Sequence, residues 1–178
     1  MSTTKWKLDP AHSEITFKVK HLMISTVTGQ FRNFNVAAET DGEDFSKPGN
    51  IEVAIDVASI DTNNEQRDNH LKSEDFFNAA KHNQLLFKST KYEGNGEDGK
   101  LYGDLTVQGN TKNIVLNVEP GGIVVDAWGQ TKAGFTVSGK ISRKDFGLTW
   151  NAVTEAGNVV VGDEIKFQGE IQLIKQAS

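Results

Sequence analysis

Four histidines and one neighbouring serine are the first side chains in this chain to test for catalytic chemistry. His12 stands beside Ser13, and the two would supply a base and a nucleophile if their side chains met. Adjacent residues of a β-strand point to opposite faces, so the two cannot meet within a strand. The four histidines, which are His12, His21, His70 and His82, are not spaced as metal ligands. These residues predict neither a nucleophilic nor a metal-dependent active site.

The sequence motifs of other enzyme classes are missing as well. There is no Gly-x-Ser-x-Gly elbow, no phosphate-cradling glycine loop and no dinucleotide-binding fingerprint. Cysteine does not occur, which excludes disulfides, thiolate metal sites and cysteine nucleophiles. We therefore expect a protein that is not an enzyme and that needs no metal and no cofactor.

A charged segment with two adjacent aromatic rings is the main candidate for a binding element. It begins at Arg67-Asp68 and ends at Phe76-Phe77. Arg67 either anchors the segment through hydrogen bonds and ion pairs or lies at the mouth of a cavity, where its guanidinium would suit a phosphate. We expect a short helical insert at about residues 64–80, with Ser73 as an N-cap, that acts as a lid or a shaped mouth.

The elements that must position these residues are β-strands. Apolar and polar residues alternate in run after run, and the last run, residues 165–173, shows the pattern most cleanly. Turn signals such as Pro120-Gly121-Gly122 separate the runs. Short strands with one buried and one solvated face predict an antiparallel barrel or sandwich. With 178 residues and no linker, the chain is expected to be one domain, residues 1–178.

Three glycines, Gly103, Gly139 and Gly169, fall on the apolar face of their strands. Such glycines either let a strand bend at a barrel corner or leave the lumen open, and the two interpretations are compatible. His21 continues the inward phase of residues 15–19. It is either a buried histidine paired with backbone or a polar contact to a ligand at the inner rim.

Charge and hydropathy limit the partners and the compartment. The net charge is −5 and the basic residues are scattered along the sequence, so nucleic acid is not an expected partner. No apolar stretch is long enough for a signal-peptide core or a membrane span. We expect a protein that does not span the membrane and is cytoplasmic as the sequence stands, or periplasmic if a leader has been removed.

Several motifs in order resemble one known family. They are Trp6-x-Leu8-Asp9-x-x-His12-Ser13, Ser59-Ile60-Asp61-Thr62, Arg67-Asp68-x-His70-Leu71, Asp75-Phe76-Phe77 and Arg143-x-Asp145-Phe146-Gly147-Leu148. The chain resembles the YceI-like family of lipocalin-like, polyisoprenoid-binding proteins. It departs from the family pattern at His82-Asn83, where relatives often carry Tyr-Pro, and it lacks the secretory leader of many relatives.

The resemblance implies an all-β fold: an antiparallel eight-stranded lipocalin-like barrel with a short helical insert. The cavity of such a barrel would hold a polyisoprenoid or quinone-like lipid as cargo, and many relatives pair as dimers, which implies a homodimer here. The implied lumen residues are Phe17, Val19, Phe31, Phe87, Leu105, Phe135 and Phe167. His21 and Arg67 are the implied head-group contacts. The expected function is that of a carrier for a long-chain isoprenoid lipid or similar amphiphile. The alternative is a non-catalytic, stress-associated interaction module with a filled barrel.

Overall fold

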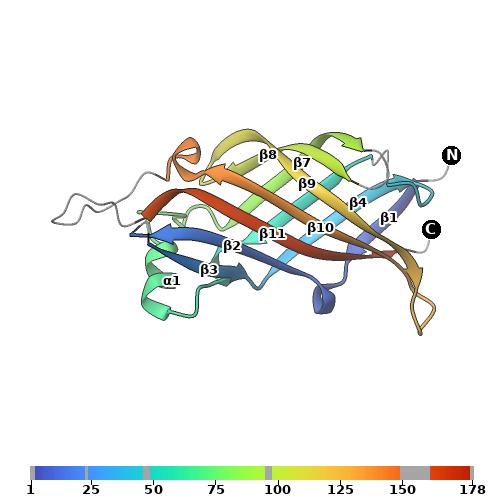
Figure 1. Ribbon diagram of the computed structural model, residues 1–178, viewed down its shortest axis with the longest axis horizontal. Helices are drawn as coiled ribbons and strands as arrows, with labels where there is room; N and C mark the ends of the chain where they lie inside the picture. Colours follow the sequence, from blue (N-terminus) through green and yellow to red (C-terminus); the bar gives the residue numbers. More distant parts are fainter. Residues whose placement is uncertain (1–2, 23, 46–48, 95–97, 149–160, 177–178) are drawn as a thin grey trace.

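The structure is a single β-sheet that curls into a barrel, with one short α-helix (Figure 1). The computed structural model describes residues 3–22, 24–45, 49–94, 98–148 and 161–176. The strands are β1 (Thr3–Leu8), β2 (Glu14–His21), β3 (Ser25–Phe31), β4 (Phe34–Asp41), β5 (Ile51–Asp56), β6 (Ile60–Asp61), β7 (Gln84–Gly94), β8 (Gly99–Val107), β9 (Asn110–Val125), β10 (Thr131–Ser142) and β11 (Val161–Lys175). The helices are α1 (Glu65–Leu71) and the 3-10 turns η1 (Pro10–His12), η2 (Val57–Ser59) and η3 (Arg143–Phe146).

Eight of these strands close into an antiparallel barrel. Their order is β1-β4-β5-β7-β8-β9-β10-β11, and β1 pairs back with β11 to complete the ring. This arrangement confirms the predicted eight-stranded, lipocalin-like barrel. Closure leaves the ring without a free edge, which removes the row of unpaired backbone groups that an open sheet presents.

The long strand β11 has two partners on one side, which extends the sheet beyond the ring. Its residues 173–175 pair with β1, whereas residues 165–170 pair with β2. The turn η1 separates β1 from β2, and its cap residue Asp9 accepts a hydrogen bond from the Ala11 backbone N–H. Strands β3 and β6 continue the sheet from β2.

Helix α1 lies at the opposite end of the barrel from the start of β1 and the end of β11 (Figure 1). Its N-cap is Asn64, whose side-chain oxygen accepts a hydrogen bond from the Arg67 backbone N–H. The expectation of an N-cap at Ser73 is therefore wrong, because α1 ends before that residue. Asparagine and serine cap helices about equally well, so the residue type alone did not show whether the helix starts after Asn64 or after Ser73.

Two of the three glycines expected to face inward, Gly103 and Gly139, are covered by phenylalanine rings, whereas Gly169 lies next to Ile171. A Cβ atom added at Gly139 would lie 2.7 Å from the Phe167 ring, and one added at Gly103 would lie 2.3 Å from the Phe87 ring. Gly139 and Phe167 are direct cross-strand partners on β10 and β11. The glycines therefore admit rings that lie across the strands, so the room they provide is partly filled by aromatic side chains.

Candidate functional site: an apolar cavity inside the barrel

The barrel encloses a cavity of about 260 Å³ that is lined almost entirely by apolar side chains. All seven lumen residues expected from the sequence line it. Further lining residues include Ile15, Val36, Ile55, Leu71, Phe76, Phe77, Tyr92, Ile114, Leu116 and Arg143. With so few polar groups in its wall, the cavity can bind hydrocarbon through burial and cannot fix a ligand through many hydrogen bonds.

Aromatic clusters pack at both ends of this cavity. Near β1, the Phe45 ring lies 4.8 Å from the ring of Trp6 and 4.8 Å from that of Phe135, measured between centroids. Toward α1, the Phe31 ring lies 5.4 Å from Phe17 and 6.2 Å from Phe77. Phe45 lies in a turn outside the alternating strands, so the sequence pattern gave no sign of its inward position.

The last residue of α1 and the segment after it form part of the cavity wall. Leu71, Phe76 and Phe77 line the cavity. Backbone hydrogen bonds hold this segment in place, such as Phe77 N–H to the Leu71 carbonyl at 3.0 Å. The predicted insert is thus a wall element whose apolar side chains face the lumen.

Arg67 is held by the loop in front of α1. Its Nε donates to Thr62 Oγ1 at 2.8 Å and its Nη2 donates to the Thr62 carbonyl at 2.6 Å. Asp68 accepts from the Thr62 backbone N–H at 2.8 Å. Arg67 is not among the residues that line the cavity, and its contacts match the loop-anchoring interpretation.

His21 also lies away from the cavity. It is the last residue of β2, is exposed to solvent and pairs across the sheet with Ser25 and Val161. The inward phase of Ile15, Phe17 and Val19 therefore does not carry over to His21 as a lining residue. The structure does not bring the two expected head-group residues, His21 and Arg67, to the cavity.

The charged residue that does reach the cavity wall is Arg143, which the sequence reasoning did not assign to the site. Only 1% of its surface is exposed. Its guanidinium donates to the carbonyls of Leu148 at 2.6 Å, Gly162 at 2.9 Å and Val161 at 3.2 Å. Burial lowers the pKa of Arg143, and the Asp163 carboxylate opposes that shift. Arg143 continues the inward phase of residues 135–141, which was the signal for its position.

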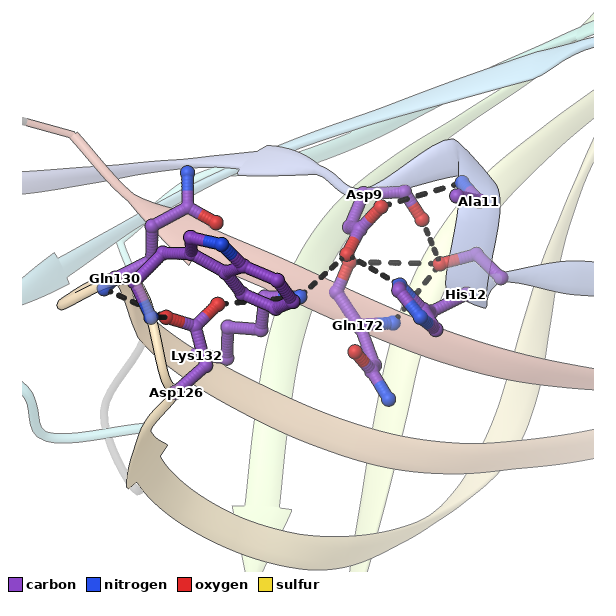
Figure 2. A network of polar contacts seen from close by, with 9 residues as sticks. Asp9, Ala11, His12, Asp126, Gln130, Lys132 and Gln172 are labelled. Carbon is purple, nitrogen blue, oxygen red and sulfur yellow. Dashed lines mark hydrogen bonds and ion pairs between the residues drawn. The ribbon is translucent and has the colours of Figure 1, made fainter.

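A second polar cluster joins η1 to the β9–β10 hairpin (Figure 2). Lys132 Nζ lies 2.8 Å from Asp9 Oδ2 and 3.6 Å from Asp126 Oδ2. His12 Nδ1 lies 2.8 Å from the same Asp9 oxygen. These four side chains do not line the apolar cavity, so the cluster lies outside the ligand space.

The electrostatics of this cluster indicate a structural role. The hydrogen bond to Asp9 raises the pKa of Lys132, which keeps the amine protonated and unsuited to act as a base or a nucleophile. The hydrogen bond from Lys132 lowers the pKa of Asp9. Backbone N–H donors from Gln130 and Trp128 lower the pKa of Asp126. Asp9, Asp126 and Lys132 are thus held in their charged forms and link η1 to the hairpin, and we call this cluster the latch.

Among the described residues, no group of three or more histidine and carboxylate side chains is placed to hold a metal ion. No helix within the same ranges is both long enough and apolar enough to cross a membrane.

An antiparallel barrel around an apolar interior defines the class of lipocalin-like barrels, and comparison with known proteins narrows the class further. The family model of the YceI-like domain matches residues 6–173. A UPF0312 protein of Staphylococcus epidermidis, SERP2314, is 38% identical over 170 residues, which cover 95% of this chain and 96% of the relative. The chain belongs to the YceI-like family.

Solved structures agree with this assignment. The YCEI protein of Campylobacter jejuni is 36% identical with a TM-score of 0.75, and the match covers 96% of this chain and 97% of that one. A polyisoprenoid binding domain from Saccharophagus degradans superimposes with a TM-score of 0.66 at 16% identity, over 96% and 98% of the two chains. At that identity the second match concerns the fold alone.

Proposed function

We propose that this protein is a non-catalytic binding protein that carries the apolar tail of an isoprenoid lipid or a similar amphiphile inside its barrel. The observation that carries the proposal is the cavity of about 260 Å³ inside the barrel, with its wall of aliphatic and aromatic side chains. Membership of the YceI-like family and the polyisoprenoid-binding description of the Saccharophagus degradans domain support the choice of tail.

The volume of the cavity sets the length of tail that fits without rearrangement. A cavity of roughly 150 Å³ holds one benzene molecule of six carbons. By proportion, a cavity of 260 Å³ takes roughly ten carbons, or two isoprene units. Burying ten carbons is worth roughly 8 kcal/mol before the costs of association. Longer tails require rings such as Phe77 or Phe167 to move aside.

Native mass spectrometry of the purified protein, with organic extraction of bound material, tests this function. We expect one prenyl lipid or quinone per chain, either copurified or after incubation with geraniol, geranylgeraniol and a longer polyprenol. Affinity should rise less from the ten-carbon to the twenty-carbon alcohol than the added hydrocarbon alone would give, because rings in the wall must move aside to admit the longer tail. The same spectrum reports whether the chain forms the expected homodimer. If the protein is purified without bound lipid and takes up none of the three alcohols, the result would favour the alternative function, an interaction module with a filled barrel.

A further inference from the structure

Strands β9 and β10 pair with each other along only part of their length. The pairing of these strands runs from Thr131–Val125 to Ser138–Asn117. Beyond that point β9 pairs with β8 through residues 110–118, and β10 pairs with β11 through residue 142. The described residues therefore leave a seam where the two strands run on with different partners.

A surface groove of about 830 Å³ lies over this seam. Its lining comes from β2, β8, β9, β10, η3 and β11. Five of the lining residues also line the inner cavity, namely Phe17, Ile114, Ile141, Phe167 and Gln168. The groove and the cavity thus meet at a shared set of largely apolar side chains.

The groove is positively charged, although the protein as a whole is negatively charged. Its lining includes five exposed lysines, which are Lys18, Lys100, Lys112, Lys140 and Lys166, and one carboxylate, Asp145. The net charge of the protein is −5, so a basic surface of this kind runs against the overall balance. We call this surface the lysine groove.

Three of these lysines stand directly opposite one another. Lys140 on β10 pairs with Lys166 on β11, and Lys166 pairs in turn with Lys18 on β2. Like charges at directly opposed positions of a sheet destabilise it. Glu164 compensates little, because its Oε1 is 3.9 Å from Lys166 Nζ and both side chains are more than half exposed. Among the described residues, no ion pair involves Lys18, Lys112 or Lys140.

We infer that the lysine groove binds the anionic head group, a phosphate or a carboxylate, of the amphiphile whose tail lies in the cavity. An anion in the groove would relieve the repulsion along the row of lysines. Its tail would enter the lumen at the seam, past Ile114 and Ile141. This inference rests on the proposed function, and it assigns the polar contacts that His21 and Arg67 do not supply.

The test compares two ligands with the same tail, geranylgeranyl monophosphate and geranylgeraniol. The variant carries Lys112→Gln, Lys140→Gln and Lys166→Gln, and a matched control carries Lys5→Gln, Lys7→Gln and Lys81→Gln, so both lose three positive charges. We expect the groove variant to bind the monophosphate at least tenfold more weakly than wild type and to bind the alcohol unchanged. The control should keep both affinities.

A second readout locates the head group directly. Acetylation of lysines, followed by mass spectrometry, should show Lys140 and Lys166 protected by the monophosphate and not by the alcohol, with Lys5 reactive throughout. Equal affinities of both proteins for both ligands, without protection, would overturn the inference and leave the proposed function intact. Failure of both ligands to bind wild type would instead defeat the proposed function.

Two further experiments distinguish the head group of a bound lipid from free phosphate and from a membrane surface. If inorganic phosphate alone protects the lysines and does not compete with the monophosphate, the groove is a free-anion site and the inference is wrong. If only vesicles containing phosphatidylglycerol discriminate between the groove variant and the control, the face docks on membranes, and the inference is again wrong.

Discussion

At the residue scale, Arg143 shows how one buried charge can hold two separate segments together. Its guanidinium reaches Leu148, just after η3, and Val161–Gly162 at the start of β11. Arginine keeps its charge in proteins and offers five donors in a planar fork, which suits several carbonyls at once. The residue therefore ties the two segments together beside the cavity through hydrogen bonds to backbone carbonyls.

Replacing Arg143 should destabilise the protein strongly. Arg143→Met removes the donors from three buried or partly buried carbonyls, and we expect a loss of about 3 kcal/mol in the free energy of unfolding. Urea denaturation followed by circular dichroism measures this loss. Lys144→Met, at the exposed neighbouring position, is the control and should change stability by less than about 0.5 kcal/mol. A similar midpoint for both variants would contradict the structural role.

The latch at η1 predicts how stability depends on pH. The pKa of Asp9 is lowered in the folded protein, chiefly by the hydrogen bond from Lys132, so the unfolded chain binds more protons in acid. The stabilisation is complete above about pH 5 and is lost as the pH falls through and below the ordinary aspartate range near 4. Thermal unfolding between pH 3 and 6 should show a steeper fall in Tm for wild type than for Asp9→Asn.

The control for this measurement is Glu119→Gln, which removes an exposed carboxylate from β9. That variant should keep the wild-type slope of Tm against pH. Identical slopes for wild type and Asp9→Asn would mean that the latch contributes nothing to acid stability.

At the scale of the element, the pairing of glycine with phenylalanine on adjacent strands controls how much of the lumen is open. Gly139 on β10 lies beneath the ring of Phe167 on β11. Gly29 on β3 lies beneath the ring of Phe17 on β2 in the same way. The missing side chain on one strand is thus the space in which the ring on the next strand lies.

Filling that space should close the cavity and spare the barrel. In Gly139→Leu the new side chain displaces the Phe167 ring, and also meets Leu116, so we expect a cost of about 1–3 kcal/mol and loss of prenyl alcohol binding. The matched control is Gly134→Leu on the same strand, where a Cβ has open space around it. Native mass spectrometry of both folded variants checks the result, and unchanged lipid stoichiometry in Gly139→Leu would contradict it.

At the scale of the whole molecule, the alternation of apolar residues predicted an antiparallel barrel or sandwich, and the resemblance to the YceI-like family implied the eight-stranded barrel and seven residues that line its cavity. Period-2 phase assigns each strand residue to one face, so residues such as Phe17 and Phe167 were placed correctly. The same alternation gave a wrong prediction for His21, because this residue lies at the end of β2, beyond the cavity. It carries no information about turns, which is why Phe45 was missed.

The lysine groove was also beyond what the sequence could predict. Lys18, Lys140 and Lys166 are far apart along the chain and look scattered, and only the register of β10, β11 and β2 brings them into one row. The seam depends likewise on where one pairing stops and another continues. Both are properties of strand register, which the alternation pattern alone does not fix across distant strands.

The join between β1 and β11 has a consequence for how this protein is made. Trp6 and Lys175 are direct partners in that join, so the two strands that complete the ring come from opposite ends of the described sequence. A ribosome delivers β1 long before β11, and until then β1 can pair only with β4. The apolar residues that line the closed barrel are therefore exposed on the nascent chain through most of synthesis. Barrels with such long-range contacts fold in milliseconds to seconds, so this apolar surface stays accessible to chaperones during that interval.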